Sequence, residues 1–247
     1  MDAEGASFER DVPVIAALGD PVRRRLYRVV ASAPEPIGRE DAAQLAGVAV
    51  HTAKFHLDKL AKDGLLEIGY RRLSGRTGPG SGRPAKVYRR AAREFAVSLP
   101  ERQYDLLSRI LATAVVEATK AGEAVAPVAV AVARKAGTEH GSSRAAEGSV
   151  EEQHTDSDLG TLTDALLPLG YEPRAEGEVL VLHNCPFHKV AQDQTELVCG
   201  LNLEFVAGVC DGLGRRSLVP ELHPDPDRCC VTVRSASGHV GPSGAGR

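Results

Sequence analysis

The chain has no cysteine in its first 184 residues, and all five of its cysteines fall within the 46 residues from Cys185 to Cys230. It has no apolar run close to the roughly 18 residues that span a membrane. Its acidic N-terminus lacks the basic-then-apolar form of a signal peptide. We therefore expect a cytoplasmic protein with no membrane partner. In such a protein an odd number of cysteines argues against a closed disulfide framework and favours metal or redox chemistry.

The two halves of the chain have opposite charge, although the net charge is only −3. Residues 21–93 contain 16 Lys and Arg against 6 Asp and Glu, whereas residues 151–238 contain 6 against 15. This asymmetry predicts a half that binds nucleic acid and an acidic half with another role.

The basic half has the pattern of a helix-turn-helix followed by a wing. Asp20 and Pro21 are typical of a helix start, and a short helix over 38–46 ends at Gly47. After a turn of about three residues, a polar helix is predicted over 50–63. Strands at 65–72 and 86–89 flank a segment rich in Gly and Pro, which predicts a hairpin.

Three stretches resemble the winged helix-turn-helix of ArsR-type bacterial regulators: residues 17–26, 51–60 and 82–88. The resemblance covers residues 11–95 and implies that the partner is a double-stranded DNA operator. Base edges are expected to meet His51, Thr52, Lys54 and Phe55, although Phe55 is equally compatible with a core position. The remaining expected DNA contacts, mostly to phosphates, are Lys59, Arg71, Arg76, Arg83 and Lys86.

The predicted fold class is α+β, with three structured parts. After a disordered terminus (1–10) comes the winged domain (11–96), and then a helical segment (98–136). That segment favours a homodimer, because helix-turn-helix regulators read paired half-sites; packing within one chain is the alternative. A Gly- and Ser-rich linker (137–157) is predicted to lead to a small αββαβ cysteine-containing domain (158–237) and a disordered tail (238–247).

Helix and strand geometry separates the five thiols. Cys199 and Cys210 are eleven residues apart on one predicted helix, or roughly 16 Å along its axis. Cys210 is therefore expected to be a packing residue. Cys229 and Cys230 are adjacent on a predicted strand, so only one of them faces the site easily; Cys229 is favoured and Cys230 is held in reserve. With Cys185 and Cys199 this gives three ligands, and His188 is a candidate for the fourth.

The acidic half resembles the sensor domain of SufR-type iron–sulfur regulators in Asn184-Cys185-Pro186-Phe187, in Cys199 and in Arg228-Cys229-Cys230-Val231. That resemblance implies a [4Fe–4S] cluster on three or four cysteines and control of cluster-assembly genes. Cys210 and Cys230 are extra, and the interval from Cys199 to Cys229 is longer than in that family.

The function predicted from the sequence is a dimeric DNA-binding transcriptional repressor, not an enzyme, that senses redox or iron–sulfur status. A second hypothesis replaces the cluster with zinc. A remote third is a thiol enzyme that uses Cys185 with His188 or His183 as base.

Overall fold

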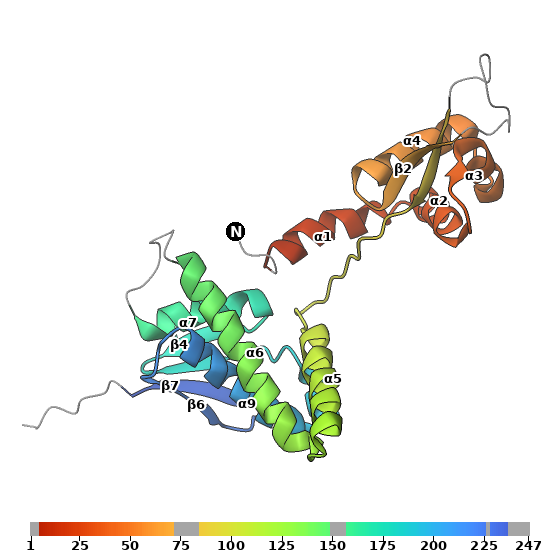
Figure 1. Cartoon of the computed structure of the whole chain (residues 1–247). Helices are drawn as coiled ribbons and strands as arrows, with labels where there is room; N and C mark the ends of the chain where they lie inside the picture. Colours follow the sequence, from red (N-terminus) through yellow and green to blue (C-terminus); the bar gives the residue numbers. More distant parts are fainter. Residues whose placement is uncertain (1–4, 72–83, 149–156, 226–227, 237–247) are drawn as a thin grey trace, which may run out of the picture. The chain divides into compact units, whose positions relative to one another are not determined.

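The chain divides into two compact units, Ala6–Val97 and Ser98–Arg247. The computed structural model describes residues 5–71, 84–148, 157–225 and 228–236 (Figure 1). The boundary between the units lies next to the predicted end of the winged domain at residue 96. No helix in the described part of the chain is long and apolar enough to cross a membrane.

The first unit, called the winged unit below, has four helices and three strands within the described residues. In chain order they are α1 (Gly5–Ala17), α2 (Pro21–Ser32), β1 (Ile37–Gly38), α3 (Arg39–Ala46), α4 (Val50–Lys62), β2 (Leu66–Arg71) and β3 (Ala85–Arg90). The strands form an antiparallel sheet in the order β1-β3-β2. This is the predicted order of a winged helix-turn-helix.

Local chemistry sets the limits of the helices in this unit. The Asp20 carboxylate accepts hydrogen bonds from the backbone N–H groups of Val22 (2.9 Å) and Arg23 (2.8 Å), so it caps α2 as predicted. Gly47 ends α3 in the left-handed conformation, with φ of 64°. The fully buried Leu26, Leu57 and Leu60 then join α2 to α4 in one core.

The prediction of a disordered terminus over residues 1–10 is wrong from Gly5 onward, because α1 begins there. The helix is held by Asp11, whose side chain is only 5% exposed. The Asp11 carboxylate accepts a hydrogen bond from the backbone N–H of Ala96 at 3.4 Å and lies 3.5 Å from the Arg93 guanidinium. A buried charge of this kind requires partners, and these come from the end of the same unit.

The second unit, called the cysteine unit below, places helices on a four-stranded sheet. Its elements are α5 (Tyr104–Ala121), α6 (Val125–Gly148), α7 (Asp158–Leu166), the 3-10 turn η1 (Leu167–Leu169), β4 (Pro173–Glu176), β5 (Val179–Leu182), α8 (His188–Asp193), α9 (Thr195–Gly212), β6 (Leu218–Leu222) and β7 (Val231–Ser235). The antiparallel sheet has the order β4-β5-β7-β6. The predicted αββαβ pattern omitted α8 and β6.

Helix α9 is the centre of this unit. It packs on one side against α6 and on the other against β6 and β7, and α5 lies beside α6 (Figure 1). Leu107 and Ile110 of α5 share a core with Phe205 and Val206 of α9. The central helices therefore pack within their own chain, which was the alternative to a purely dimeric role.

The prediction of a linker from residue 137 is wrong for residues 137–148, because α6 continues to Gly148. Glycine serves there for close packing. A Cβ atom added to Gly137 would stand 2.0 Å from the Phe205 carbonyl oxygen, and one added to Gly208 would stand 2.1 Å from the Arg134 carbonyl oxygen. Gly141 and Gly212 repeat these contacts one turn further along. The backbones of α6 and α9 therefore approach as only glycine permits. Residues 149–156 of the predicted linker and the predicted tail lie outside the described residues.

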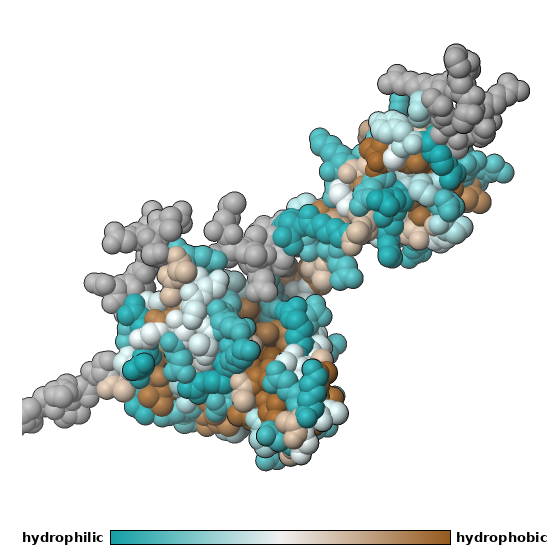
Figure 2. All heavy atoms as spheres, in the orientation of Figure 1, coloured by the Kyte–Doolittle hydropathy of each residue, from teal (hydrophilic) through white to brown (hydrophobic). Residues whose placement is uncertain are grey.

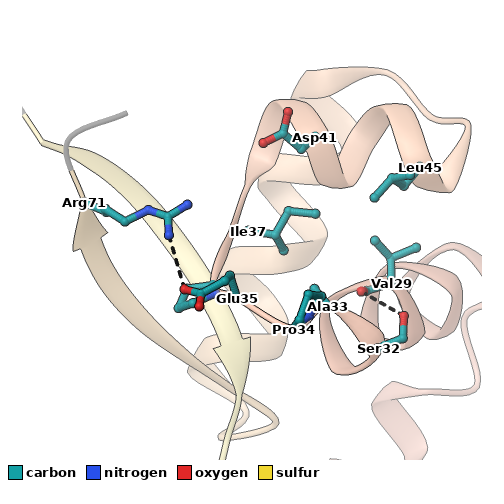
Figure 3. Close-up of a pocket in the computed structure, with 10 residues that line it drawn as sticks. Val29, Ser32, Ala33, Pro34, Glu35, Ile37, Asp41, Leu45 and Arg71 are labelled. Atoms are coloured by element: carbon teal, nitrogen blue, oxygen red, sulfur yellow. Dashed lines mark hydrogen bonds and ion pairs between the residues drawn. The ribbon is translucent and has the colours of Figure 1, made fainter. Parts of the chain in front are cut away.

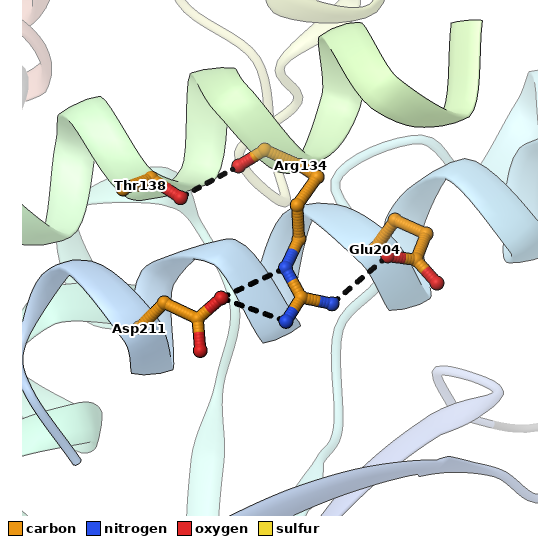
Figure 4. A network of polar contacts seen from close by, with 4 residues as sticks. All are labelled: Arg134, Thr138, Glu204 and Asp211. Carbon is orange, nitrogen blue, oxygen red and sulfur yellow. Dashed lines mark hydrogen bonds and ion pairs between the residues drawn. The ribbon is translucent and has the colours of Figure 1, made fainter. Parts of the chain in front are cut away.

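Ion pairs cover the solvent edge of this helix pair. The Arg134 guanidinium of α6 donates to Asp211 at 2.7 and 2.9 Å and to Glu204 at 3.0 Å, both on α9 (Figure 4). All three side chains are partly exposed. These pairs fix the register of the two helices, while most of the stabilisation comes from the buried contacts beneath.

Candidate metal centre and nucleic-acid interface

Three segments of the cysteine unit bring four thiols together. Cys185 follows the end of β5, Cys199 lies in the second turn of α9, and Cys229 and Cys230 precede β7. The backbone N–H of Cys229 donates to the Leu182 carbonyl at 3.0 Å. This bond places the end of β5 and the approach to β7 side by side, so the Cys185 and Cys229 thiols meet.

The four thiols form two contacting pairs. The sulfur atoms of Cys199 and Cys230 are 3.2 Å apart, and Cys185 is hydrogen-bonded to Cys229. Cys185 also acts electrostatically on Cys199, as Cys230 does on Cys229, so the two pairs adjoin.

Cys229 and Cys230 both face this cluster, contrary to the expectation that only one would. The alternation rule applies within a strand, and β7 begins only at Val231. Cys230 lies in a bend, and its carbonyl accepts a hydrogen bond from the backbone N–H of His223. The bend turns both side chains to the same side. Cys230 is therefore a full member of the thiol cluster.

Cys210 lies apart from the cluster, as its spacing from Cys199 predicted. Helix α9 runs without a break through Gly200 and Gly208, so the two cysteines stay three turns apart. Cys210 is buried near Arg134 and Asp211, and burial raises the pKa of its thiol to about 12. It acts as a packing residue.

His188 does not join the thiols. It is the first residue of α8, and its backbone N–H donates to the Cys185 carbonyl at 3.1 Å. Its half-buried ring makes no hydrogen bond to any of the thiols within the described residues. The geometry therefore supports neither a histidine ligand nor a Cys185–His188 catalytic pair.

Two polar residues beside the thiols were missed by the sequence reasoning. The buried Asn202 side chain donates to the Cys229 sulfur at 3.2 Å and accepts a hydrogen bond from the Tyr171 hydroxyl. Asn202 is three positions after Cys199 on α9, and therefore on the same face. A lone amide on an otherwise apolar face was the available signal.

The thiols differ in acidity because their neighbours differ. The hydrogen bond from Cys229 lowers the pKa of Cys185 to about 7 against the opposing effect of burial, and the Arg102 guanidinium contributes to the decrease. The same hydrogen bond, and then burial, raise the pKa of Cys229 well above its ordinary value. Burial, and then Cys230, raise the pKa of Cys199 to about 12. Cys185 is thus the most readily ionised of these three.

An arginine and an amide fix the cysteine loop from outside. The Arg102 guanidinium donates to the Cys185 carbonyl at 2.9 Å and to the Asn184 side-chain oxygen. The Asn184 amide donates in turn to the carbonyls of Glu101 (3.1 Å) and Gly170. Every polar atom of the Asn184 side chain is thereby engaged, which explains its burial.

The donor set fits a soft metal or an iron–sulfur cluster, since four thiols and no hard oxygen ligand converge. As the thiols lie, no group of three or more His, Cys, Asp or Glu side chains among the described residues is arranged to hold a metal ion. Ligation therefore requires the thiols to move from these positions, and only Cys230 is more than marginally exposed among the four.

The winged unit exposes the start of α4. Lys54 and His51 are exposed, Thr52 is half-buried, and the Phe55 side chain is 68% exposed, which excludes a core position for Phe55. Ala53, Leu57 and Leu60 turn to the core on the opposite face. The first two turns of α4 thus present basic, polar and aromatic side chains outward, as a major-groove reader requires.

Four of the nine predicted DNA contacts lie at the start of α4, and three others are held in ion pairs. Lys86 of β3 binds Asp58 of α4 at 2.7 Å, Lys59 binds Asp63 at 2.7 Å, and Arg71 lies 3.4 Å from Glu35. Arg76 and Arg83 lie outside the described residues. The Tyr88 hydroxyl also donates to Asp58, at 2.8 Å, so Asp58 joins β3 to α4.

A hollow of the winged unit has no residue of α4 in its lining. It is an open depression of about 540 Å³ between the end of α2, α3 and β2, with the Arg71–Glu35 pair on one side and Leu45 on another (Figure 3). It contains no cysteine or histidine, and we assign it no part in the metal chemistry.

The comparison with known proteins agrees with the geometry of this unit. Residues 18–68 match the family described as a helix-turn-helix domain. The winged unit is a helix-turn-helix domain of a DNA-binding transcriptional regulator. Neither the curated proteins nor the solved structures contain a significant match to the chain. Regulators of this class are not usually enzymes.

Proposed function

We propose that this transcriptional regulator senses redox or iron–sulfur status through a [4Fe–4S] cluster held by Cys185, Cys199, Cys229 and Cys230. The observation that carries the proposal is the selective convergence of these thiols. Four of the five cysteines meet from three separate segments, whereas Cys210, on the same helix as Cys199, does not. Core packing by itself does not require four cysteines to lie together.

The chemistry of the donor set supports a cluster. Thiolates are the usual ligands of iron–sulfur clusters, and the resemblance of the Cys185, Cys199 and Cys229 segments to SufR-type sensors points the same way. When bound, the cluster supplies a group that responds to oxidants and to iron supply. The chain itself sets the Cys185 thiol beside the Cys229 thiol and encloses most of the donors in apolar side chains.

Zinc is the second candidate, and one distance favours it. Tetrahedral zinc, with Zn–S bonds of about 2.3 Å, sets its sulfur ligands roughly 3.8 Å apart. The Cys199–Cys230 sulfur separation of 3.2 Å needs less opening to reach that spacing than to surround a larger cluster. A zinc protein would be a structural or metal-sensing regulator with the same DNA-binding unit.

Metal analysis of the full chain separates these candidates. The protein is purified anaerobically, reconstituted with ferrous iron and sulfide, and assayed for iron, sulfide, zinc and visible absorption. About four iron and four sulfide per chain, lost in Cys185→Ser and kept in Cys210→Ser, would support the cluster. One zinc per chain with no bound iron would replace the cluster with zinc. A colourless, metal-free wild type would refute both.

The regulator is proposed to act as a homodimeric repressor on a two-fold operator. Figure 2 shows apolar side chains on the surface of the cysteine unit. Val115 (49%) and Val116 (51%) of α5 are among its exposed apolar residues. A second copy would cover them. Light scattering on the wild type and on a Val115→Glu/Val116→Glu protein tests this: a dimeric wild type and a monomeric variant are expected, and a monomeric wild type would contradict it.

A further inference from the structure

A short strap connects the thiol site with the chain that leads to the DNA reader. Residues 98–103 form no helix or strand and follow directly from the winged unit, which ends at Val97. They lead into α5. In the first turn of α5 the backbone N–H of Leu107 donates a hydrogen bond to the Gln103 carbonyl. Any motion passed along the peptide chain between the two units goes through this strap.

The strap is fastened to the cysteine loop at three successive residues. The Glu101 carbonyl accepts from the Asn184 amide at 3.1 Å, the Arg102 guanidinium donates to the Cys185 carbonyl at 2.9 Å, and the Gln103 N–H donates to the Pro186 carbonyl at 3.1 Å. Residues 101–103 thus pair with residues 184–186. Cys185 is both an expected metal ligand, through its sulfur, and an anchor of the strap, through its carbonyl.

The turn at Gly170 contacts both the strap, at Glu101, and the cysteine loop, at Asn184. Gly170 has φ of +76°, and a Cβ atom added there would stand 2.7 Å from the Glu101 Cβ. Its carbonyl accepts the second hydrogen bond of the Asn184 amide. Asn184 and Arg102 thus carry the side-chain hydrogen bonds between the strap and the cysteine loop.

We propose that Arg102 and Asn184 are positioning residues that couple metal binding at the thiols to DNA binding, by transmitting the state of the Cys185 loop to the strap. Binding of a metal to Cys185 fixes the cysteine loop, and the fixed loop holds the strap in place. The strap then restricts the motion of the segment that leads to the winged unit. Loss of the metal frees the loop and lets the strap move. The inference rests on the proposed function, since it needs a metal at the thiols.

Two measurements on the full chain test the coupling. The first is amide hydrogen exchange of the wild type, metal-free and after reconstitution with ferrous iron and sulfide. Exchange in residues 101–105 should slow by about tenfold or more on loading. Equal exchange in the two states would overturn the coupling, and this measurement requires no variant to fold.

The second measurement is the ratio of DNA affinities of loaded and metal-free protein, on a duplex selected by the wild type from a random pool. Couplings between sites are commonly about 5- to 150-fold. In Arg102→Gln the ratio should fall to within about twofold of one, with metal content and the DNA affinity of the metal-free form kept. Arg109→Gln, at an exposed arginine on α5, is the matched control and should keep the wild-type ratio.

The possible outcomes distinguish a failure of this coupling from a failure of the proposed sensing function. An Arg102→Gln protein that keeps its metal and the full ratio overturns the coupling alone. One that loses its metal also overturns it, because Arg102 would then act on the metal site itself. A wild type that binds no metal, or binds DNA equally in both states, overturns the proposed sensing function and the coupling with it.

Discussion

Gly137 of α6 lies so close to Phe205 of α9 that no side chain fits between them: a Cβ atom at position 137 would be 2.0 Å from the Phe205 carbonyl oxygen. The same helix α9 contributes Cys199 and Asn202 to the thiol cluster.

Gly137→Ala should therefore destabilise the cysteine unit. Forcing a methyl group into a filled space costs about 1–3 kcal/mol, which should appear in the free energy of unfolding by urea. Gly200→Ala is the control on α9, since a Cβ there meets nothing within 4 Å. It should be neutral or stabilise by up to about 1 kcal/mol, from helix propensity. Equal effects from the two substitutions would show that α6 and α9 do not pack this closely.

Phe55→Ala should weaken DNA binding with little effect on folding, because the Phe55 side chain is exposed on α4. We expect about 1–3 kcal/mol of lost binding, the range of a good base contact, and less than about 0.5 kcal/mol of lost stability. Fluorescence anisotropy and urea unfolding measure the two. The buried Leu57 of the same helix provides the contrast, since Leu57→Ala should cost about 2–5 kcal/mol of stability. A severely destabilised Phe55→Ala protein would contradict the exposed placement.

Asp58→Asn should weaken the attachment of β3 to α4. Asp58 is partly buried, which opposes ionisation, yet hydrogen bonds from Lys86 and Tyr88 hold its pKa below the usual 3.8. With the pKa lowered on folding, the stabilisation is present above pH 3.8 and is lost as pH falls through the folded value. Amide protection factors in α4 and β3, measured against the intrinsic exchange rate at each pH, should fall in the variant and, in the wild type, at acid pH. Glu35→Gln, which breaks the exposed pair with Arg71, should change neither.

Cys185 should be the first of the buried thiols to react in metal-free, reduced protein. Its pKa is lowered to about 7, whereas the pKa values of Cys199 and Cys210 are raised to about 12. At pH 8 Cys185 is therefore mostly thiolate and the other two are thiols, and thiolate is the reactive form. Mass spectrometry after brief iodoacetamide treatment should find the label on Cys185 before Cys199 or Cys210, at a rate that rises with pH around 7. A Cys229→Ser protein, with the thiol donor replaced, should show an altered midpoint.

Periodic and capping signals predicted the winged unit well. Asp20, Pro21 and Gly47 act on their immediate neighbours, and the apolar positions of α4 repeat at helical spacing, so each of these features is readable within a few residues. The same local reasoning separated Cys210 from Cys199, because helix geometry alone sets their distance. It failed for residues 137–148, where glycine was taken as a mark of flexibility. Gly137 and Gly141 pack against α9, and only the partner helix reveals it.

The sequence by itself determined which kinds of residue this protein contains and in which half of the chain they lie. It has a basic reader, an acidic unit and a group of thiols with no histidine-rich motif nearby, and these follow from composition and short-range geometry. Only the tertiary structure decided that Cys230 joins Cys229 in facing Cys185 and Cys199, that Asn202 and Tyr171 stand beside them, and that Arg102 fastens the cysteine loop to the strap. Arg102 is 83 residues from Cys185, and contacts at such separations depend on how the sheet pairs and where a strand begins, which no local pattern specifies.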